Sequence, residues 1–458
     1  MSSSSNAVTD LTKVGHAPYV SIDGNLVPWD RNLGNISSVG MQYGAGCLDG
    51  MVHSVGVTFD GVPFIAIPDF FRHLGRHMFN SARSVLLDPV SSLEDAYRLA
   101  VEGKSAISLP TENGRLVNFE DYQRMYLRYV FACMNEGRVD TNYSRPFYYV
   151  TDQVINQVLN GPDNSFAIDP TLYNKSLVLM FERWPHLLAP RDTEFAGLNV
   201  LLTDVSLSPA PAASFIQYKS ASSYQPTRGP AVKLKNDINA RFSAELGFAI
   251  NDVMLLDHTG RFVREASGSN CFFVRPNGSM LTPRTDGSIF PGLTRQFVLD
   301  LAASEVGGLL GLKIEHQDLY GSAIDTFARG GEMFLTGSAL GLIPVKRVVV
   351  PLKPNPTSKD DFRVIEFGEP RISKVIADCY RAFSLGFGAE VQIGDKKARM
   401  DMSDKTLRVE IDRDMHERAV SFYRQKRDLP LDQIMRSGSV SLVAPKCSRV
   451  ATRSNLIV

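Results

Sequence analysis

The stretch VMLLDHTGRFVREASGSNCFFV, residues 253–274, alternates short apolar runs with turn-forming residues. Short apolar runs bounded by Gly, Ser and Asn are typical of strands, so the sequence predicts strands at 252–256 and 271–275. Glu265 lies between these strands, ahead of a Ser-Gly-Ser-Asn turn. The stretch therefore predicts two strands that hold one carboxylate near a turn, although a glutamate in such a place is more often a surface residue.

Strands and helices are mixed on both sides of this stretch. Residues 18–29 predict a hairpin around an Asp-Gly turn, and amphipathic patterns predict helices at 119–136 and 236–246. A helix is also predicted at 293–304, after FPGLTR, and a strand at 333–336. This pattern favours an α/β (α+β) fold with more than one domain.

A change in composition marks the expected boundary between domains. Residues 185–196, PHLLAPRDTEFA, contain two prolines and no periodicity, which is typical of a connecting loop. The expected organisation is a disordered tail at 1–16, a small N-terminal domain at 17–185, an interdomain loop at 186–196, a large domain at 197–389 and a C-terminal extension at 390–458.

Composition narrows the class of partner. The 458 residues include 49 basic and 49 acidic side chains, and the resulting net charge of zero argues against nucleic acid, which requires a basic surface. No apolar run approaches the roughly 20 residues needed to cross a bilayer, so no membrane partner is expected. The five cysteines are odd in number and lack CxxC pairs, which predicts reduced thiols in a cytoplasmic protein and no metal site.

Lys219 is the first candidate for covalent chemistry. It lies in FIQYKSASSYQ, residues 215–225, close to the predicted domain junction and five residues before Tyr224. A lysine can form a Schiff base with a carbonyl compound if burial or nearby cations lower its pKa. Most lysines are solvated surface charges, and Tyr224 taken alone is more simply a core or rim aromatic.

Two glycine-containing segments are candidates for an anion site. FPGLTR (290–295) opens a predicted helix, and LTGSALGLIPV (335–345) also combines glycine with small or hydroxyl residues. Backbone N–H groups at a helix N-terminus, together with hydroxyl groups, suit a phosphate monoester. Ordinary helix capping would explain either segment equally well.

The order of these motifs resembles the class IV (fold-type IV) PLP-dependent aminotransferases, which include the branched-chain amino acid aminotransferases. The resemblance covers residues 18–388 and extends to QYGAGCLDGM (42–51), to His73-Leu-Gly-Arg76 and to the Tyr-x-Arg-Pro of YSRPFYYV (143–150). It implies a two-domain enzyme with a smaller N-terminal α/β domain and a larger C-terminal domain that resembles a barrel.

The resemblance also implies a role for each motif. Lys219 would be the catalytic lysine that binds pyridoxal 5′-phosphate (PLP), and Lys233 in TRGPAVKLKND (227–237) is a second candidate that lacks a tyrosine five residues on. Tyr143 and Arg145 would help form the substrate pocket. The cofactor would be bound by Arg76, Lys219, Tyr224, Glu265, Leu293, Thr294, Ser338 and Ala339, with Glu265 at the pyridine nitrogen and Arg76 and both glycine-containing turns at the phosphate.

The activity implied is transfer of an amino group from a branched-chain-like amino acid to a 2-oxo acid such as 2-oxoglutarate, by a homodimer. An aminodeoxychorismate-type lyase, a D-amino acid or amine transaminase and a non-catalytic binding homologue are the alternatives. The sequence departs from the family pattern by an insertion after Tyr224, by Leu48 and Asp49 where phenylalanine and glutamate are common, and by the unmatched residues 390–458.

Overall fold

The computed structural model describes most of the chain. The described residues are 19–28, 46–85, 92–104, 107–135, 143–151, 174–182, 197–203, 218–426, 432, 434, 438–446 and 449–451. The expected tail at 1–16 and the interdomain loop at 186–196 lie outside these ranges, so the domain boundaries stay predictions.

An antiparallel sheet forms the first part of the structure, and the hairpin predicted at 18–29 is one edge of it. Asp23 and Gly24 both have positive φ, as the tight turn between its two strands requires. The strands run in the order β2-β1-β10-β9-β3, with β4 also paired to β9. Their bounds are β1 Tyr19–Ile22, β2 Asn25–Pro28, β3 Gly46–Leu48, β4 Met51–Val52, β9 Tyr143–Val150 and β10 Lys175–Glu182.

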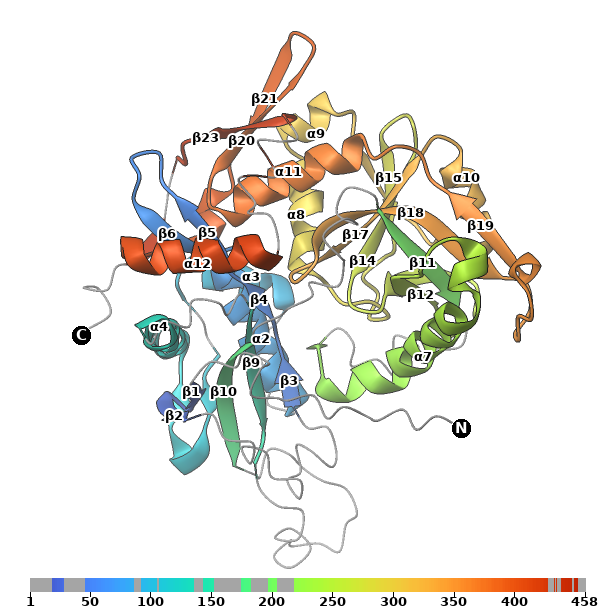
Figure 1. Ribbon diagram of the computed structural model, residues 1–458. Coiled ribbons are helices and arrows are strands. Elements are labelled where there is room, and N and C mark those ends of the chain that lie inside the picture. The colour runs from blue at the N-terminus through green and yellow to red at the C-terminus, as the bar shows by residue number, and fades with distance from the viewer. Residues whose placement is uncertain are drawn as a thin grey trace, which may run out of the picture.

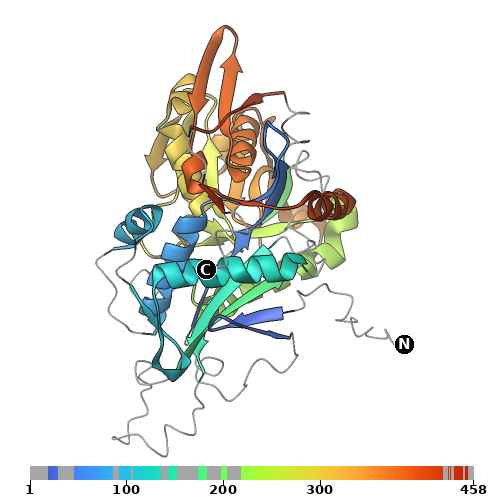
Figure 2. The same ribbon diagram turned by 90° about the vertical axis from the view of Figure 1, so that its left-hand side faces the viewer.

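Helices pack on this sheet through their apolar faces. The helix predicted at 119–136 is α4 (Phe119–Asn135), and Figure 2 shows it lying across the strands. Its tyrosines 122, 126 and 129 are fully buried in one core with residues of α2 and of β9 and β10. The other elements here are α2 (Phe70–Ser84), α3 (Leu93–Val101) and a short hairpin of β7 (Leu109–Pro110) and β8 (Leu116–Val117).

A closed barrel of six strands forms the second part, as the sequence led us to expect. The order is β13-β12-β11-β18-β17-β14, and pairing of Glu265 with Asn270 joins β13 to β14 and closes the ring. The strands predicted at 252–256, 271–275 and 333–336 are three of its members. The barrel strands are β11 Leu198–Thr203, β12 Asp252–Leu256, β13 Val263–Ala266, β14 Asn270–Val274, β17 Glu332–Gly337 and β18 Gly341–Pro351, with β15 (Ser279–Thr282), β16 (Lys313–His316) and β19 (Phe362–Glu366) attached outside.

Helices surround the barrel (Figure 1). Helix α7 (Ala221–Leu246) begins 15 residues before the start predicted at 236, and it packs on β12 through Ile238 and Phe242. The helix predicted at 293–304 is α8 (Leu293–Ala302), whose Phe297 stacks on Phe383 of α11. The remaining helices are α9 (Glu305–Leu309), α10 (Asp325–Ala328) and α11 (Ile372–Ser384).

The segment after residue 390 extends two small sheets. Strand β22 pairs antiparallel with β6 of the N-terminal part, and β20 and β21 form a hairpin that projects from the molecule in Figure 1. The bounds are β5 Ser54–Val57, β6 Pro63–Ile67, β20 Gly388–Ile393, β21 Lys396–Met400, β22 Leu407–Glu410, α12 Arg413–Lys426, β23 Val440–Val443 and β24 Arg449–Ala451. Within the described part of the chain, no helix is both long and apolar enough to cross a membrane.

Candidate active site

A pocket lies where the barrel meets the N-terminal parts of α7 and α8. Five of the predicted site residues line it, namely Lys219, Glu265, Leu293, Thr294 and Ser338. Residues without a predicted role also line it, among them Arg228, Ser269, Asn270, Phe290 and Thr336.

Lys219 lies at the pocket with an unusual backbone conformation. It has a left-handed conformation with φ 53°, which is uncommon outside glycine, and α7 begins two residues later. The Leu48 N–H donates to the Lys219 carbonyl at 3.2 Å, and Cys47 forms a β-bridge with Ser220. The stretch is therefore fastened to β3, which fixes where the lysine side chain begins.

Burial makes the Lys219 amine easier to deprotonate. It lowers the pKa of Lys219 to about 8, the cations Arg76 and Arg145 add to the effect, and Asp49 opposes it. The Nζ atom lies 4.8 Å from the centre of the Phe290 ring. The lysine is therefore a nucleophile and base with a much larger neutral fraction near pH 8 than a solvated lysine has.

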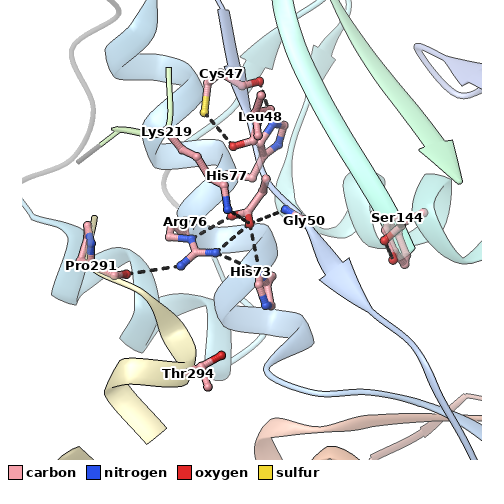
Figure 3. A network of polar contacts seen from close by, with 12 residues as sticks. Cys47, Leu48, Gly50, His73, Arg76, His77, Ser144, Lys219, Pro291 and Thr294 are labelled. Atoms are coloured by element: carbon pink, nitrogen blue, oxygen red, sulfur yellow. Dashed lines mark hydrogen bonds and ion pairs between the residues drawn. The ribbon is translucent and has the colours of Figure 1, made fainter. Parts of the chain in front are cut away.

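Asp49 is buried beside Lys219 and is the centre of a polar network. Figure 3 shows three other members of the network, Lys219, Arg76 and His73. Its carboxylate accepts from both Nε and Nη2 of Arg76, from the Gly50 N–H at 2.6 Å, and contacts His73 Nδ1 at 3.2 Å. Lys219 Nζ lies 3.9 Å from Oδ1. Burial opposes ionisation of Asp49, but Arg76, His73 and Lys219 together hold its pKa well below the usual value.

Arg76 lies behind the first predicted phosphate turn and does not line the pocket. Its Nη1 donates to the Pro291 carbonyl at 3.4 Å, next to the turn that begins α8. Its guanidinium also lies over the Phe290 ring, 4.7 Å from the centre. The structure thus places Arg76 near that turn, with most of its hydrogen-bonding capacity directed to Asp49.

Glu265 is buried and accepts hydrogen bonds from three protein donors among the described residues. Its Oε2 accepts from the Phe290 N–H at 3.0 Å and from Asn270 Nδ2 at 3.2 Å. Its Oε1 accepts from Arg228 Nη2 at 2.7 Å. Burial raises the pKa of Glu265, and the attraction of Arg228 opposes this rise.

Both glycine-containing turns contribute to the lining of the pocket. Gly292 is the N-cap of α8, and Leu293 and Thr294 are the first helical residues, whose N–H groups have no partner within a helix. Ser338 follows β17 and lines the pocket, whereas Ala339 lies in the same turn outside the lining.

Two buried hydroxyl groups in the pocket lack hydrogen-bond partners among the described residues. They are Thr336 Oγ1 on β17 and Ser269 Oγ before β14. A buried polar atom without a partner is costly in a native protein unless a ligand satisfies it. Together with the N-terminus of α8, these hydroxyls are suited to the oxygens of a bound phosphate.

The remaining predicted residues lie outside the pocket lining. Tyr143 and Arg145 begin β9, and the Tyr143 phenol packs so closely on Gly50 that no side chain would fit there. Tyr224 belongs to the first turn of α7, and its side chain lies outside the described residues. Lys233 lies further along α7, is 76% exposed and pairs with Asp237 at 2.6 Å.

The sequence had given no role to Arg228, Thr336 or Ser269. All three lie in stretches noted above, namely 227–237, 335–345 and the Ser-Gly-Ser-Asn turn, but no residue type or spacing distinguished them within these stretches. Asp49 had been noted only as a departure from a family pattern, and its buried contact with Arg76 depends on packing between β3 and α2.

Comparison with known sequences identifies the barrel segment. Residues 200–348 match the sequence model of the family "Amino-transferase class IV". A probable branched-chain-amino-acid aminotransferase of Synechocystis sp. is 29% identical over 197 residues, which are 41% of this chain and 57% of the relative. A putative branched-chain-amino-acid aminotransferase of Methanocaldococcus jannaschii is 35% identical over 119 residues, 25% of this chain and 38% of the relative. The matched segments thus span less than two thirds of these relatives.

Solved structures share the fold over a longer range. The branched-chain aminotransferase of Thermoproteus uzoniensis with norvaline has a TM-score of 0.52 at 18% identity, covering 81% of this chain and 96% of that one. The PLP form of the branched-chain amino acid aminotransferase from Thermobaculum terrenum has a TM-score of 0.50 at 15% identity, covering 81% and 95%. Residues 200–348 are thus similar in sequence to the class IV aminotransferases, and the chain shares its fold with solved branched-chain aminotransferases.

Proposed function

We propose that the protein is a PLP-dependent aminotransferase that acts on branched-chain-like amino acids. The observation that carries the proposal is the meeting of Lys219, Glu265 and the turn Gly292–Thr294 at one pocket, although they lie far apart in sequence. A lysine nucleophile, an acceptor for a ring nitrogen and a phosphate site are the three groups that PLP requires of a protein.

The pocket residues fit the cofactor at both of its ends. The partnerless hydroxyls of Thr336 and Ser269, with the N-terminus of α8, would bind the phosphate. Glu265 would face the ring nitrogen, with its carboxylate held in place by Asn270 and the Phe290 N–H. In the same proposal, Arg76, Ser338 and Ala339 support the phosphate site, and Tyr224 lies beside the ring.

Lys219 would act first as a base and then as an acid. When bound, PLP supplies an electron sink that makes a substrate Cα proton acidic. The Nζ atom of Lys219, whose pKa is lowered to about 8 by burial, would accept that proton and return it at a different carbon. The Phe290 ring beneath Nζ would help exclude water from this atom.

The substrate side of the proposal rests on β9 and on the names of the relatives. Tyr143 and Arg145 would contribute to the amino acid site, because Arg145 is close enough to Lys219 to lower its pKa. A guanidinium is a suitable partner for a substrate carboxylate. The relatives named above are branched-chain aminotransferases, which favours branched-chain donors over the alternatives; 2-oxoglutarate would be the acceptor.

The proposed setting is a homodimer in the cytoplasm. Cys47, Cys133, Cys271 and Cys379 are buried and form no disulfide among the described residues, which suits a reducing compartment. Analytical ultracentrifugation of the full chain would test the dimer directly.

Borohydride reduction with peptide mapping tests the proposal. The protein is supplied with PLP and reduced, and a pyridoxyl mass is expected on Lys219 in the wild type. Lys233→Ala should keep the label and Lys219→Ala should lose it, because Lys233 is exposed and outside the pocket. Formation of glutamate from L-leucine and 2-oxoglutarate then tests the reaction. A label on Lys233, or on no specific lysine, would overturn the assignment of Lys219.

A further inference from the structure

Arg228 is a buried arginine in the candidate active site to which neither the motifs nor the proposed reaction assigns a role. It lies on α7, lines the pocket and is only 6% exposed. Its Nη2 donates to Glu265 Oε1 at 2.7 Å, and its Nε donates to the Ser267 carbonyl. The guanidinium is thus held at two points against the turn that follows β13.

The contacts of Glu265 limit what else it can bind. A carboxylate offers about four acceptor positions, two on each oxygen. Oε2 already accepts from the Phe290 N–H and Asn270 Nδ2, while Oε1 accepts from Arg228. Any further donor must therefore use Oε1, the oxygen that carries the guanidinium.

The need to share Oε1 with Arg228 affects a protonated ring nitrogen in particular, because the guanidinium is positively charged. A second cation at Oε1 would lie beside the Arg228 guanidinium, and like charges in a buried site disfavour the charged form of a group. A neutral ring would meet no such repulsion. Arg228 is therefore placed to weaken the attraction between Glu265 and a ring N–H⁺.

We propose that Arg228 is a positioning residue that occupies Glu265 Oε1 and thereby weakens the hold of Glu265 on the ring nitrogen of PLP. The inference rests on the proposed function, because it requires PLP in this pocket. It differs from a purely structural role for the ion pair, which would change stability but not the dependence of binding on the ring nitrogen.

The test compares the affinities of the apo-protein for PLP and for its 1-deaza analogue, in which C–H replaces the ring nitrogen. Wild type is expected to bind both with similar affinity. Arg228→Gln removes the cation and releases Oε1, so the preference for PLP should increase by roughly tenfold or more, the value of a charge-assisted hydrogen bond. Arg228→Lys keeps a cation and should retain the wild-type ratio.

Arg241→Gln is the matched control, since Arg241 lies on the same helix, outside the pocket, and donates to the Pro356 carbonyl. Circular dichroism establishes that each variant is folded. An unchanged ratio in Arg228→Gln would overturn the inference, as would equal ratios for the Gln and Lys variants. Failure of wild type to bind either compound would instead overturn the proposed function, and the inference with it.

Discussion

The Arg76 guanidinium donates to both oxygens of Asp49, Nε to Oδ2 at 2.8 Å and Nη2 to Oδ1 at 2.7 Å. Both side chains are buried, so this two-point pair joins α2 to the segment between β3 and β4 away from water. The pair also determines the charge next to Lys219, because Asp49 neutralises a cation that would otherwise repel the ammonium group. Stability and the chemistry of the lysine are therefore linked through one carboxylate.

Replacing Asp49 should destabilise the protein strongly. Asp49→Asn leaves Arg76 charged and buried without its counter-ion, a change that typically costs about 3–5 kcal/mol of unfolding free energy. Urea denaturation measures this loss of unfolding free energy. Asp237→Asn is the control, since Asp237 forms an exposed pair with Lys233 and its replacement should change the unfolding free energy little. A cost for Asp49→Asn no larger than that of the control would contradict the buried pair.

The rate of PLP capture by the apo-protein should depend on the ionisation of Lys219. Only the neutral amine reacts, so the rate should rise with pH through a midpoint near 8 and fall as the amine is protonated below it. A solvated lysine would give a midpoint of about 10.4. In Asp49→Asn the midpoint should move lower still, because Asp49 raises the pKa of Lys219. Stopped-flow absorbance measures the rate. A midpoint above 10 in wild type would contradict a lowering of the pKa of Lys219 by burial.

Thr336→Val should weaken PLP binding without weakening the fold. The Thr336 hydroxyl is buried with no partner among the described residues, so removing it should leave the unfolding free energy unchanged or higher. If the hydroxyl donates to the phosphate, the dissociation constant should increase by about tenfold. Fluorescence titration measures the constant. Thr326→Val removes an exposed hydroxyl that donates to the Ala323 carbonyl and should bind PLP as wild type does; equal affinities for all three proteins would exclude this contact.

The sequence singled out several residues that line the pocket, because they belong to short local motifs. Glu265 and Thr294 each stand at a fixed place next to a strand or at a helix start, and both line the pocket. Arg228 could not be predicted in this way. It is 37 residues from Glu265, on a part of α7 that contains Pro226, Gly229 and Pro230, which normally argue against a helix.

The structure of the C-terminal segment also could not be predicted from local sequence patterns. Residues 407–410 pair with β6, more than 300 residues earlier in the chain, and Val409 is fully buried there. A segment of four residues has little intrinsic preference for strand structure, and packing determines which strand it pairs with. The segment therefore had no predicted role, although it completes a sheet with the N-terminal part.

A final prediction concerns Gly292, which begins the proposed phosphate turn. A Cβ atom at this position would lie 2.3 Å from Asn270 Oδ1, so alanine would have to displace Asn270 from Glu265 and from the Phe290 carbonyl. Gly292→Ala should therefore cost about 1–3 kcal/mol of unfolding free energy and weaken PLP binding. Gly308 on α9 provides the matched control, because a Cβ there meets nothing within 4 Å and alanine should stabilise the helix by up to about 1 kcal/mol. Thermal and urea unfolding of the two variants, with PLP titration of each, would compare them directly. If Gly292→Ala behaved like Gly308→Ala in both measurements, the close approach of the turn to Asn270 would have no part in holding Glu265.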